Sequence, residues 1–577
     1  SFAERRRLAG LAGSSWDDYD RTVLSRGAGI WSRDTKAIEV SPPARRALGV
    51  EAGVMTPPEL IAAVLAAPVD LLWFGGIGTY VRAADESDTD VGDVANDGVR
   101  ITSNQLRARV VAEGGNLGVT QRGRIRYSRR GGRINTDFID NAAGVAISDR
   151  EVNLKILLAL AIEERRLEPE ARDQLLAAVT GDVVAAVLQQ VDNSVVALSR
   201  AVPTSAAELD AYEALIETLE RGGYLDRAVE ALPDVDELAT RRQAGAGLIR
   251  PELAVLLAYA KSALVADIEA SELPDDPALV DSVSPYFPPA IRDQCATLVT
   301  QHRLYPQLVA TDVAGEVVDQ MGVTWAHETA AALHRSRVDV AAAFWAARQV
   351  LSAGPRWEKL MRSTAGVYAP GADLDLEAHR FVVAAVDVVA RRYLARPGPV
   401  QPGVVIANDR AVADVLAAAT LRAGGAAERD RLVALGADVE LAEELARWSA
   451  AVDVVDVSAI CRSIGGQPLD VADVLVAIDD ASGLAPMINA ARAAGAAGSR
   501  WAAWQAEALA ADVRAWRHGA AVSLIDIHGH PKAARDAIDS WRAEGAFAAA
   551  DALRSCLGTR DDLIVATLAV RSLPFGP

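Results

Sequence analysis

Cysteine is scarce in this sequence of 577 residues. The three cysteines, Cys295, Cys461 and Cys556, are widely spaced and form no CxxC pair. Disulfide-stapled folds and structural zinc sites need paired spacings, so we expect neither, and free thiols fit a reducing compartment.

Histidine is also rare, with seven residues and none before His302. A Ser-His-Asp or Cys-His catalytic device built within the front of the chain is therefore excluded. His528 and His530 flank a single glycine, but the neighbouring sequence supplies no third and fourth metal ligands. A loop before Pro531 explains them better, and we expect no metal site.

Long hydrophobic runs are absent as well. The longest, such as residues 253–260 and 381–386, are far shorter than the about 20 residues that cross a membrane. The arginine-containing opening, residues 1–13, has too short an apolar part for a secretory signal. We expect a cytoplasmic protein with no membrane partner. Because the chain starts at Ser1, a processed or truncated product stays open.

Basic side chains are outnumbered, with 59 Lys and Arg against 78 Asp and Glu and a net charge of -19. The excess is uneven, because residues 1–150 carry 20 basic and 19 acidic side chains. An acidic surface repels phosphate backbones, which argues against a nucleic-acid partner. The near-neutral front is the better place for a dinucleotide.

What the chain does have is apolar content, 51% of residues, enough for large cores in about two to four domains. Its pattern predicts an α/β segment over residues 1–155 and an all-helical region over 156–577. A further subdivision of the helical region near 397–403 stays open, because that stretch is rich in proline.

The front segment alternates helices and strands. Thr56, Pro57 and Glu59 form a capping box that predicts a helix, which leads into an apolar run ended by Gly75 and Gly76. We predict parallel strands, joined by right-handed crossovers, over residues 69–74, about 109–112 and about 133–139.

From about residue 152 the apolar residues recur with helical spacing. The clearest predicted helices cover residues 152–166, 171–191, 250–270 and 338–351. Breaks are predicted at Gly222–Gly223, 273–289, 369–371 and 396–402.

Two glycine- and asparagine-rich turns, AEGGN (112–116) and DNAAG (140–144), follow predicted strands. Asparagine both donates and accepts, as a nicotinamide carboxamide requires, so Asn116 and Asn141 could hold that group at one sheet edge. The alternative is that both asparagines only take left-handed turn positions. FGGIGTYV (74–81) lacks the third glycine of GxGxxG, which favours a tight strand exit that contacts at most the ribose side of a cofactor.

Two further features have ordinary structural explanations. An arginine-rich stretch could bind phosphate or an acidic substrate, but a solvated helix face or subunit contact is more common. This stretch comprises Arg122, Arg124, Arg126, Arg129, Arg130 and Arg133. Ser148 with Glu151 reads as a helix N-cap with its capping-box glutamate.

The segments AEGGNLGVTQRGRI (112–125), GGRINTDFIDNAAGV (131–145) and SDREVNLKIL (148–157) resemble the large-type NAD-specific glutamate dehydrogenases. The likeness is close over residues 70–158 and weaker from there to the C-terminus. It implies NAD-dependent oxidative deamination of L-glutamate to 2-oxoglutarate and ammonium. It also implies a partial Rossmann-like parallel sheet followed by a large helical domain, whose helices we expect to be scaffold and homo-oligomer contacts.

The resemblance implies specific contacts. Ser148 falls on the serine that contacts the substrate side-chain carboxylate. The implied cofactor-binding residues are Gly75, Gly76, Gly114, Gly115, Asn116, Asn141 and Ala142. The family places its catalytic lysines and aspartate before the point where this chain begins. We therefore expect no catalytic residue in this chain and no turnover by the chain alone.

Four positions depart from the family pattern. Phe74 and Arg82 replace its Asn and Lys, and Ala146 and Arg150 replace an acid and a histidine. Loss of polar groups near a cleft would alter or weaken activity. The alternative function is a non-catalytic helical interaction or regulatory protein with a degenerate nucleotide-binding fold.

Overall fold

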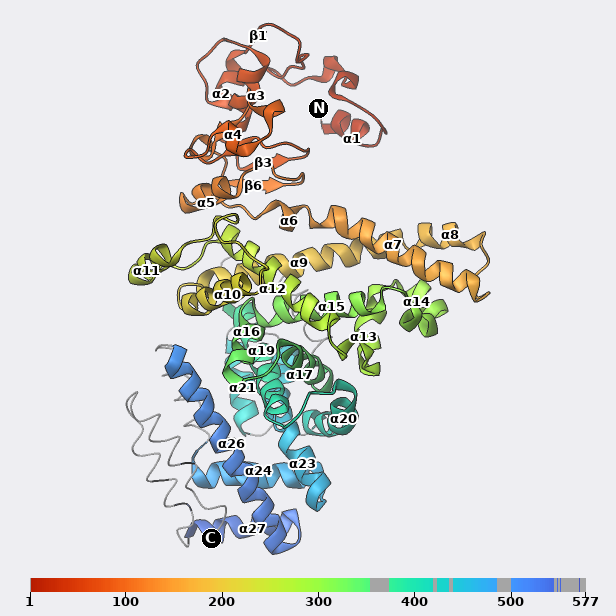
Figure 1. The fold of residues 1–577 in the computed structure, drawn as a ribbon, viewed down its shortest axis with the longest axis vertical. Coiled ribbons are helices and arrows are strands. Elements are labelled where there is room, and N and C mark those ends of the chain that lie inside the picture. The colour runs from red at the N-terminus through yellow and green to blue at the C-terminus, as the bar shows by residue number, and fades with distance from the viewer. Residues whose placement is uncertain are drawn as a thin grey trace. The chain divides into compact units, whose positions relative to one another are not determined.

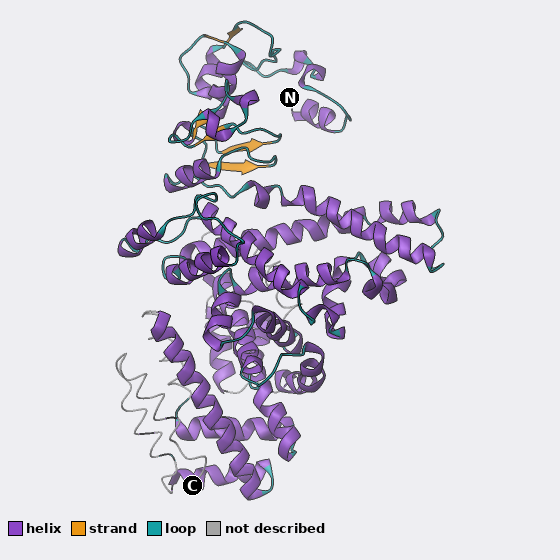
Figure 2. Ribbon diagram, in the orientation of Figure 1, coloured by secondary structure: helices purple, strands orange, loops and turns teal. Residues whose placement is uncertain are grey.

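The computed structural model describes residues 2–352, 373–418, 423–434, 439–484 and 500–543, with Phe547, Asp551 and Val570. The described residues are mostly helical, and their strands lie between Ile38 and Glu113 (Figure 2). An α/β segment with a small parallel sheet is thus followed by a large helical part, as predicted. The predicted break at 369–371 and Cys556 lie outside the described residues, while Cys295 and Cys461 are free thiols.

The chain divides into two compact units. The first contains residues 1–156, 168–209 and 216–259, and the second contains residues 157–167, 210–215 and 260–577.

The strands of the first unit are β1 (Ile38–Glu39), β2 (Val54–Met55), β3 (Leu71–Phe74), β4 (Val81–Arg82), β5 (Ile101–Thr102) and β6 (Val110–Glu113). Its helices are α1 (Phe2–Ala9), α2 (Pro42–Leu48), α3 (Pro57–Leu65), α4 (Asp88–Val91), α5 (Gln121–Arg129), α6 (Asp137–Asp140), α8 (Ala171–Ala178), α9 (Thr180–Thr204) and α11 (Val235–Gln243). The predicted capping box is confirmed, because the Glu59 N–H donates to Thr56 Oγ1 and the Thr56 N–H donates to Glu59 Oε2.

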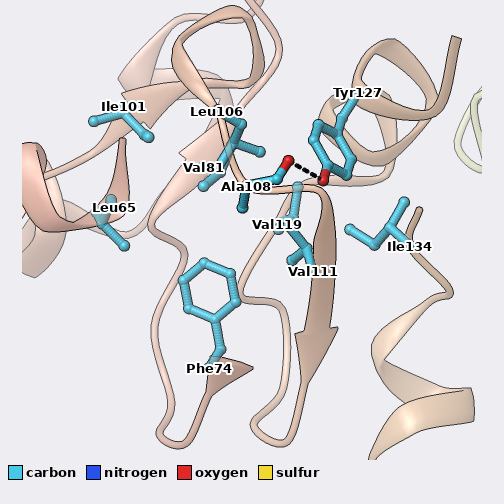
Figure 3. Close-up of a cluster of buried hydrophobic side chains, with 10 residues drawn as sticks. All are labelled: Leu65, Phe74, Val81, Ile101, Leu106, Ala108, Val111, Val119, Tyr127 and Ile134. Atoms are coloured by element: carbon cyan, nitrogen blue, oxygen red, sulfur yellow. Dashed lines mark hydrogen bonds between the residues drawn. The ribbon is translucent and has the colours of Figure 1, made fainter. Parts of the chain in front are cut away.

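Strands β3 and β6 run side by side and parallel, with Leu71 opposite Val110 and Phe74 opposite Glu113 (Figure 1). This confirms the first two predicted strands. Phe74, Val111 and Val119 belong to a buried apolar cluster in which the sheet packs against Leu65 of α3 and Tyr127 of α5 (Figure 3).

The third predicted strand, over 133–139, is wrong. Arg133 makes a single parallel bridge to Val110, and Asp137–Asp140 form helix α6. The short apolar pair Phe138-Ile139 is compatible with either a strand or a helix. The side chains of Asp137 and Asp140 favour the helix, because they accept hydrogen bonds from the backbone amides of Leu117 and Glu113.

Helices α7 (Ala142–Glu163), α10 (Leu209–Arg221) and α12 (Arg250–Glu269) contribute residues to both units. Helix α7 starts ten residues before the predicted position. The N-cap interpretation of Ser148 is therefore wrong, because Ser148 lies inside this helix. Asn141 ends α6, and the strong helix former alanine at 142 and 143 lets α7 begin at once.

The second unit is helical. Its described helices are α13 (Val280–Val283), α14 (Pro289–Cys295), α15 (Tyr305–Met321), α16 (Trp325–Leu333), α17 (Arg337–Val350), α19 (Asp373–Leu394), α20 (Pro402–Ala418), α21 (Ala423–Ala434), α22 (Val439–Ala451), α23 (Val454–Ile464), α24 (Pro468–Ser482), α26 (Arg500–His528) and α27 (Pro531–Ala543). Its core includes the fully buried Val313 of α15 and Phe344 of α17.

The predicted helices are confirmed, although 171–191 is split at Val179 between α8 and α9. The breaks at Gly222–Gly223 and 396–402 are confirmed as well, whereas residues 273–289 contain short helical segments, including α13. Within the described chain, no single helix is long and apolar enough to cross a membrane. Helices α8 and α9 meet that length and composition only when taken together, across a 45° bend.

Candidate functional site

The site begins where β3 and β6 end, at two glycine turns. Because the strands are parallel, Gly75-Gly76 and Gly114-Gly115 leave the sheet at the same edge. The Gly114 N–H donates to the Phe74 carbonyl at 2.8 Å. A Cβ on Gly115 would lie 2.4 Å from the Gly76 carbonyl oxygen, so the two turns touch where no side chain fits.

An indole covers one side of these turns. A Cβ on Gly75 or on Gly114 would lie within 2.7 Å of the Trp73 ring, which is itself 64% exposed. The ring therefore lies against both turns while remaining open to solvent.

The structure brings the two predicted asparagines together. Asn141 Nδ2 donates to Asn116 Oδ1 at 2.7 Å. This leaves Asn116 Nδ2 as a donor and Asn141 Oδ1 as an acceptor, the complement of a primary carboxamide. The left-handed position in the turn falls on Leu117, with φ 56°, and Asn141 has φ -100°. The alternative explanation of the asparagines as left-handed turn residues is therefore wrong.

A buried ion pair lies directly beneath the second turn. Glu113, the last residue of β6, has no exposed surface, and Arg124 of α5 is 3% exposed. Arg124 Nε donates to Glu113 Oε2 at 2.7 Å, and Nη2 donates to Oε1 at 2.8 Å. Arg124 Nη2 also lies 2.9 Å from Asp137 Oδ1, so one guanidinium joins two carboxylates.

Three carboxylates hold the backbone of the second turn. Glu113 Oε1 accepts from the Val119 N–H at 3.0 Å, and Asp137 Oδ2 accepts from the Leu117 N–H at 2.8 Å. Asp140 Oδ2 accepts from the Glu113 N–H at 3.0 Å. The side chains of Asp137 and Asp140 thus join helix α6 to the AEGGN turn, at the backbone amides before and after Asn116.

Burial also changes the acidity of two of these groups. Burial raises the pKa of Glu113 above its ordinary value, against the opposing hydrogen bond from Arg124. Burial likewise raises the pKa of Asp140, against a hydrogen bond from Asn135.

Sequence reasoning missed Glu113, Asp137 and Asp140, and it grouped Arg124 with surface arginines. A signal was present for Glu113, because a charged residue closes the otherwise apolar strand Val-Val-Ala-Glu just before two glycines. Arg124 follows Gly123 and precedes Ile125, both on the buried side of α5.

The remaining predicted residues lie along α7. Ala142 is its first residue, directly after Asn141. Ser148 is exposed and stands seven residues beyond Asn141, about 10 Å along a helix axis. Val145, 72% exposed, lies between them. Ser148 is therefore about two helical turns from the asparagine pair and not in its hydrogen-bond network.

The structure shows where three of the four departures place their side chains. The Phe74 side chain points into the buried cluster (Figure 3). Arg82 Nε binds Asp88 Oδ1 at 2.9 Å. Arg150 Nη2 donates to Gln190 Oε1 at 3.5 Å. Among the described residues, no group of three or more His, Cys, Asp or Glu side chains could hold a metal ion.

Comparison with known proteins relates both parts of the chain to glutamate dehydrogenases. Residues 1–201 match the family described as bacterial NAD-glutamate dehydrogenase, catalytic domain, and residues 245–573 match glutamate dehydrogenase, C-terminal. Curated relatives named NAD-specific glutamate dehydrogenase are similar to it. They are 42% identical over 360 residues in Halomonas elongata, 42% over 368 in Mycobacterium tuberculosis and 43% over 357 in Pseudomonas aeruginosa. Each alignment covers 62% of this chain and 22% of the relative.

Proposed function

Because this chain belongs to the bacterial NAD-specific glutamate dehydrogenase family, we propose that it forms part of an enzyme that oxidises L-glutamate with NAD to 2-oxoglutarate and ammonium. The chain spans 22% of the length of the curated relatives, so the rest of the catalytic machinery would come from other parts of that enzyme. The observation that carries the proposal is the hydrogen-bonded pair Asn116–Asn141 at the edge of the parallel sheet.

In this proposal Asn116 Nδ2 donates to the carboxamide oxygen of the nicotinamide, and Asn141 Oδ1 accepts from its NH2 group. The contacting turns Gly75-Gly76 and Gly114-Gly115, with Ala142, allow the backbone to approach the cofactor closely. NAD, when bound, supplies the hydride acceptor. The protein's part is to orient the ring, because hydride transfer needs reacting atoms about 3–3.5 Å apart.

Ser148 is proposed to bind the side-chain carboxylate of glutamate through its hydroxyl. Ser148 and the apolar Val145 before it are both exposed on α7, so the hydroxyl is accessible to a substrate. No catalytic lysine is assigned in this chain, and we expect no turnover by the chain alone.

We further propose that residues 1–155 are the C-terminal half of a Rossmann-like NAD-binding domain and residues 156–577 an all-helical domain, divisible near 397–403. The parallel β3–β6 pair with helix α5 after it supports the first assignment. The helical domain would provide scaffold and homo-oligomer contacts.

The test is substitution of the asparagine pair in the complete enzyme. Asn116→Ala and Asn141→Ala should each cost about 1–3 kcal/mol of transition-state binding, which lowers kcat/KM for NAD roughly fivefold to 150-fold. The double variant should be little worse than either single variant, because each asparagine orients the other. NADH formation measures the rates, and Asn104→Ala, on an exposed turn before β6, is the control. Unchanged kinetics in both single variants would refute the assignment.

A further inference from the structure

A pocket of about 480 Å³ lies at the other end of β6, away from the glycine turns. It is bounded by the residues just before β6 and by the turn after α5. Its charged and aromatic wall consists of Asp70, Arg107, Arg109, Tyr127, Arg130 and Arg133. Four arginines around one carboxylate make this pocket positive in a chain whose net charge is -19.

Most of this positive charge is not neutralised by the protein. Arg109 Nη1 lies 3.0 Å from Asp70 Oδ1 in an exposed ion pair. In the part of the chain that the structure describes, Arg107, Arg130 and Arg133 have no carboxylate within 4.0 Å. Exposed ion pairs contribute little, so even Arg109 can exchange its partner.

Two of the four guanidinium groups, those of Arg107 and Arg130, are held in place by neutral acceptors. Arg107 Nη2 donates to the Leu48 carbonyl at 2.7 Å, and Nη1 donates to the Gly49 carbonyl at 3.4 Å. Arg130 Nη1 donates to the Ser103 carbonyl at 3.2 Å, a contact that uses neither Nε nor Nη2. These bonds orient the cations and leave N–H groups for a ligand.

The backbone around the pocket is equally fixed. The Arg133 N–H donates to the Arg109 carbonyl at 3.1 Å, and the Val111 N–H donates to the Arg133 carbonyl at 2.9 Å. The buried Tyr127 hydroxyl donates to the Ala108 carbonyl at 2.8 Å and closes the floor (Figure 3). Arg109 and Arg133 are thus held on adjacent backbone segments.

We propose that this pocket binds a compact small-molecule polyanion, with phosphate groups as the favoured chemistry. Planar guanidinium forks match phosphate oxygens in pairs, and a pocket of this volume suits a small ligand. The site lies at the end of β6 opposite the proposed NAD contacts and does not depend on the proposed dehydrogenase activity.

Calorimetric titration of the protein with inorganic pyrophosphate tests this directly. Arg130→Gln/Arg133→Gln should weaken binding at least tenfold, and rising salt should weaken binding to the unsubstituted protein. Both side chains are exposed, and an unchanged Tm confirms that the double variant folds. Arg122→Gln, an exposed arginine on α5, the helix that precedes Arg130, lies outside the pocket wall and is the matched control.

A second titration with tricarballylate, a small tricarboxylate, separates the two sources of negative charge. Binding of pyrophosphate alone assigns the site to phosphate, and binding of both assigns it to polyanions in general. No binding of either ligand, or equal affinity in the double variant and the Arg122→Gln control, would overturn the proposal.

Discussion

Replacing Arg124 by leucine should release the turn that carries Asn116. The substitution leaves Glu113 and Asp137 buried without the guanidinium that joins them, at 2.7–2.9 Å in the native structure. Removing one partner of a buried ion pair costs about 3–5 kcal/mol. If this cost appears as local opening, amide exchange over residues 113–119 should accelerate by roughly a hundredfold to a few thousandfold.

Hydrogen exchange followed by mass spectrometry measures this segment directly. The Val119 and Leu117 amides should respond most, because Glu113 and Asp137 accept their hydrogen bonds. Arg126→Leu is the control on the same helix, since its ion pair with Asp85 is about half exposed and worth about 0–1 kcal/mol.

A double substitution tests the electrostatic cause. Arg124→Leu/Glu113→Gln should recover part of the lost protection, because one of the two stranded carboxylates is then neutral. If Arg124→Leu accelerated exchange no more than Arg126→Leu does, the ion pair would not be what holds the turn.

Two other predictions concern packing and pH. Gly115→Ala should destabilise the first unit by about 1–3 kcal/mol in denaturant unfolding, because its Cβ would meet the Gly76 carbonyl at 2.4 Å. Gly76→Ala, which meets nothing within 4 Å, should change stability much less, and equal effects would contradict the contact. In the second unit, burial raises the pKa of Asp479 to about 7. The folded state therefore favours the protonated Asp479 carboxyl, and this contribution to stability is complete below about pH 4 and is lost as the pH rises through 7. The Tm of the unsubstituted protein should fall over that pH range, and the Tm of Asp479→Asn should fall less steeply. Parallel Tm curves would rule this out.

Local signals in the sequence predicted much of the fold. The capping box at Thr56 and Glu59 involves residues three apart, so the sequence contains the whole interaction. The apolar run before Gly75 likewise marks β3, and its parallel partner β6 follows from the second glycine turn. Helical periodicity located α12 and α17 within one or two residues.

Tertiary contacts account for what the sequence did not reveal. The carboxylates of Asp137 and Asp140 bind amides of Leu117 and Glu113, 20 and 27 residues away, and this turned a predicted strand into helix α6. Arg124 reaches Glu113 across 11 residues, which no local pattern indicates. The asparagine pair was expected from the turn chemistry, but its direct hydrogen bond depends on α6.

The exposed Trp73 ring gives this region an optical property. An indole that touches two backbone bends and still faces water emits according to how wet and how crowded its surroundings are. A molecule arriving at those bends would dry one face of the ring and shift or quench its fluorescence. Subtracting the emission of the Trp73→Phe variant isolates the signal of Trp73 from that of the other ten tryptophans. Trp73 is therefore an intrinsic fluorescent probe beside the sheet edge.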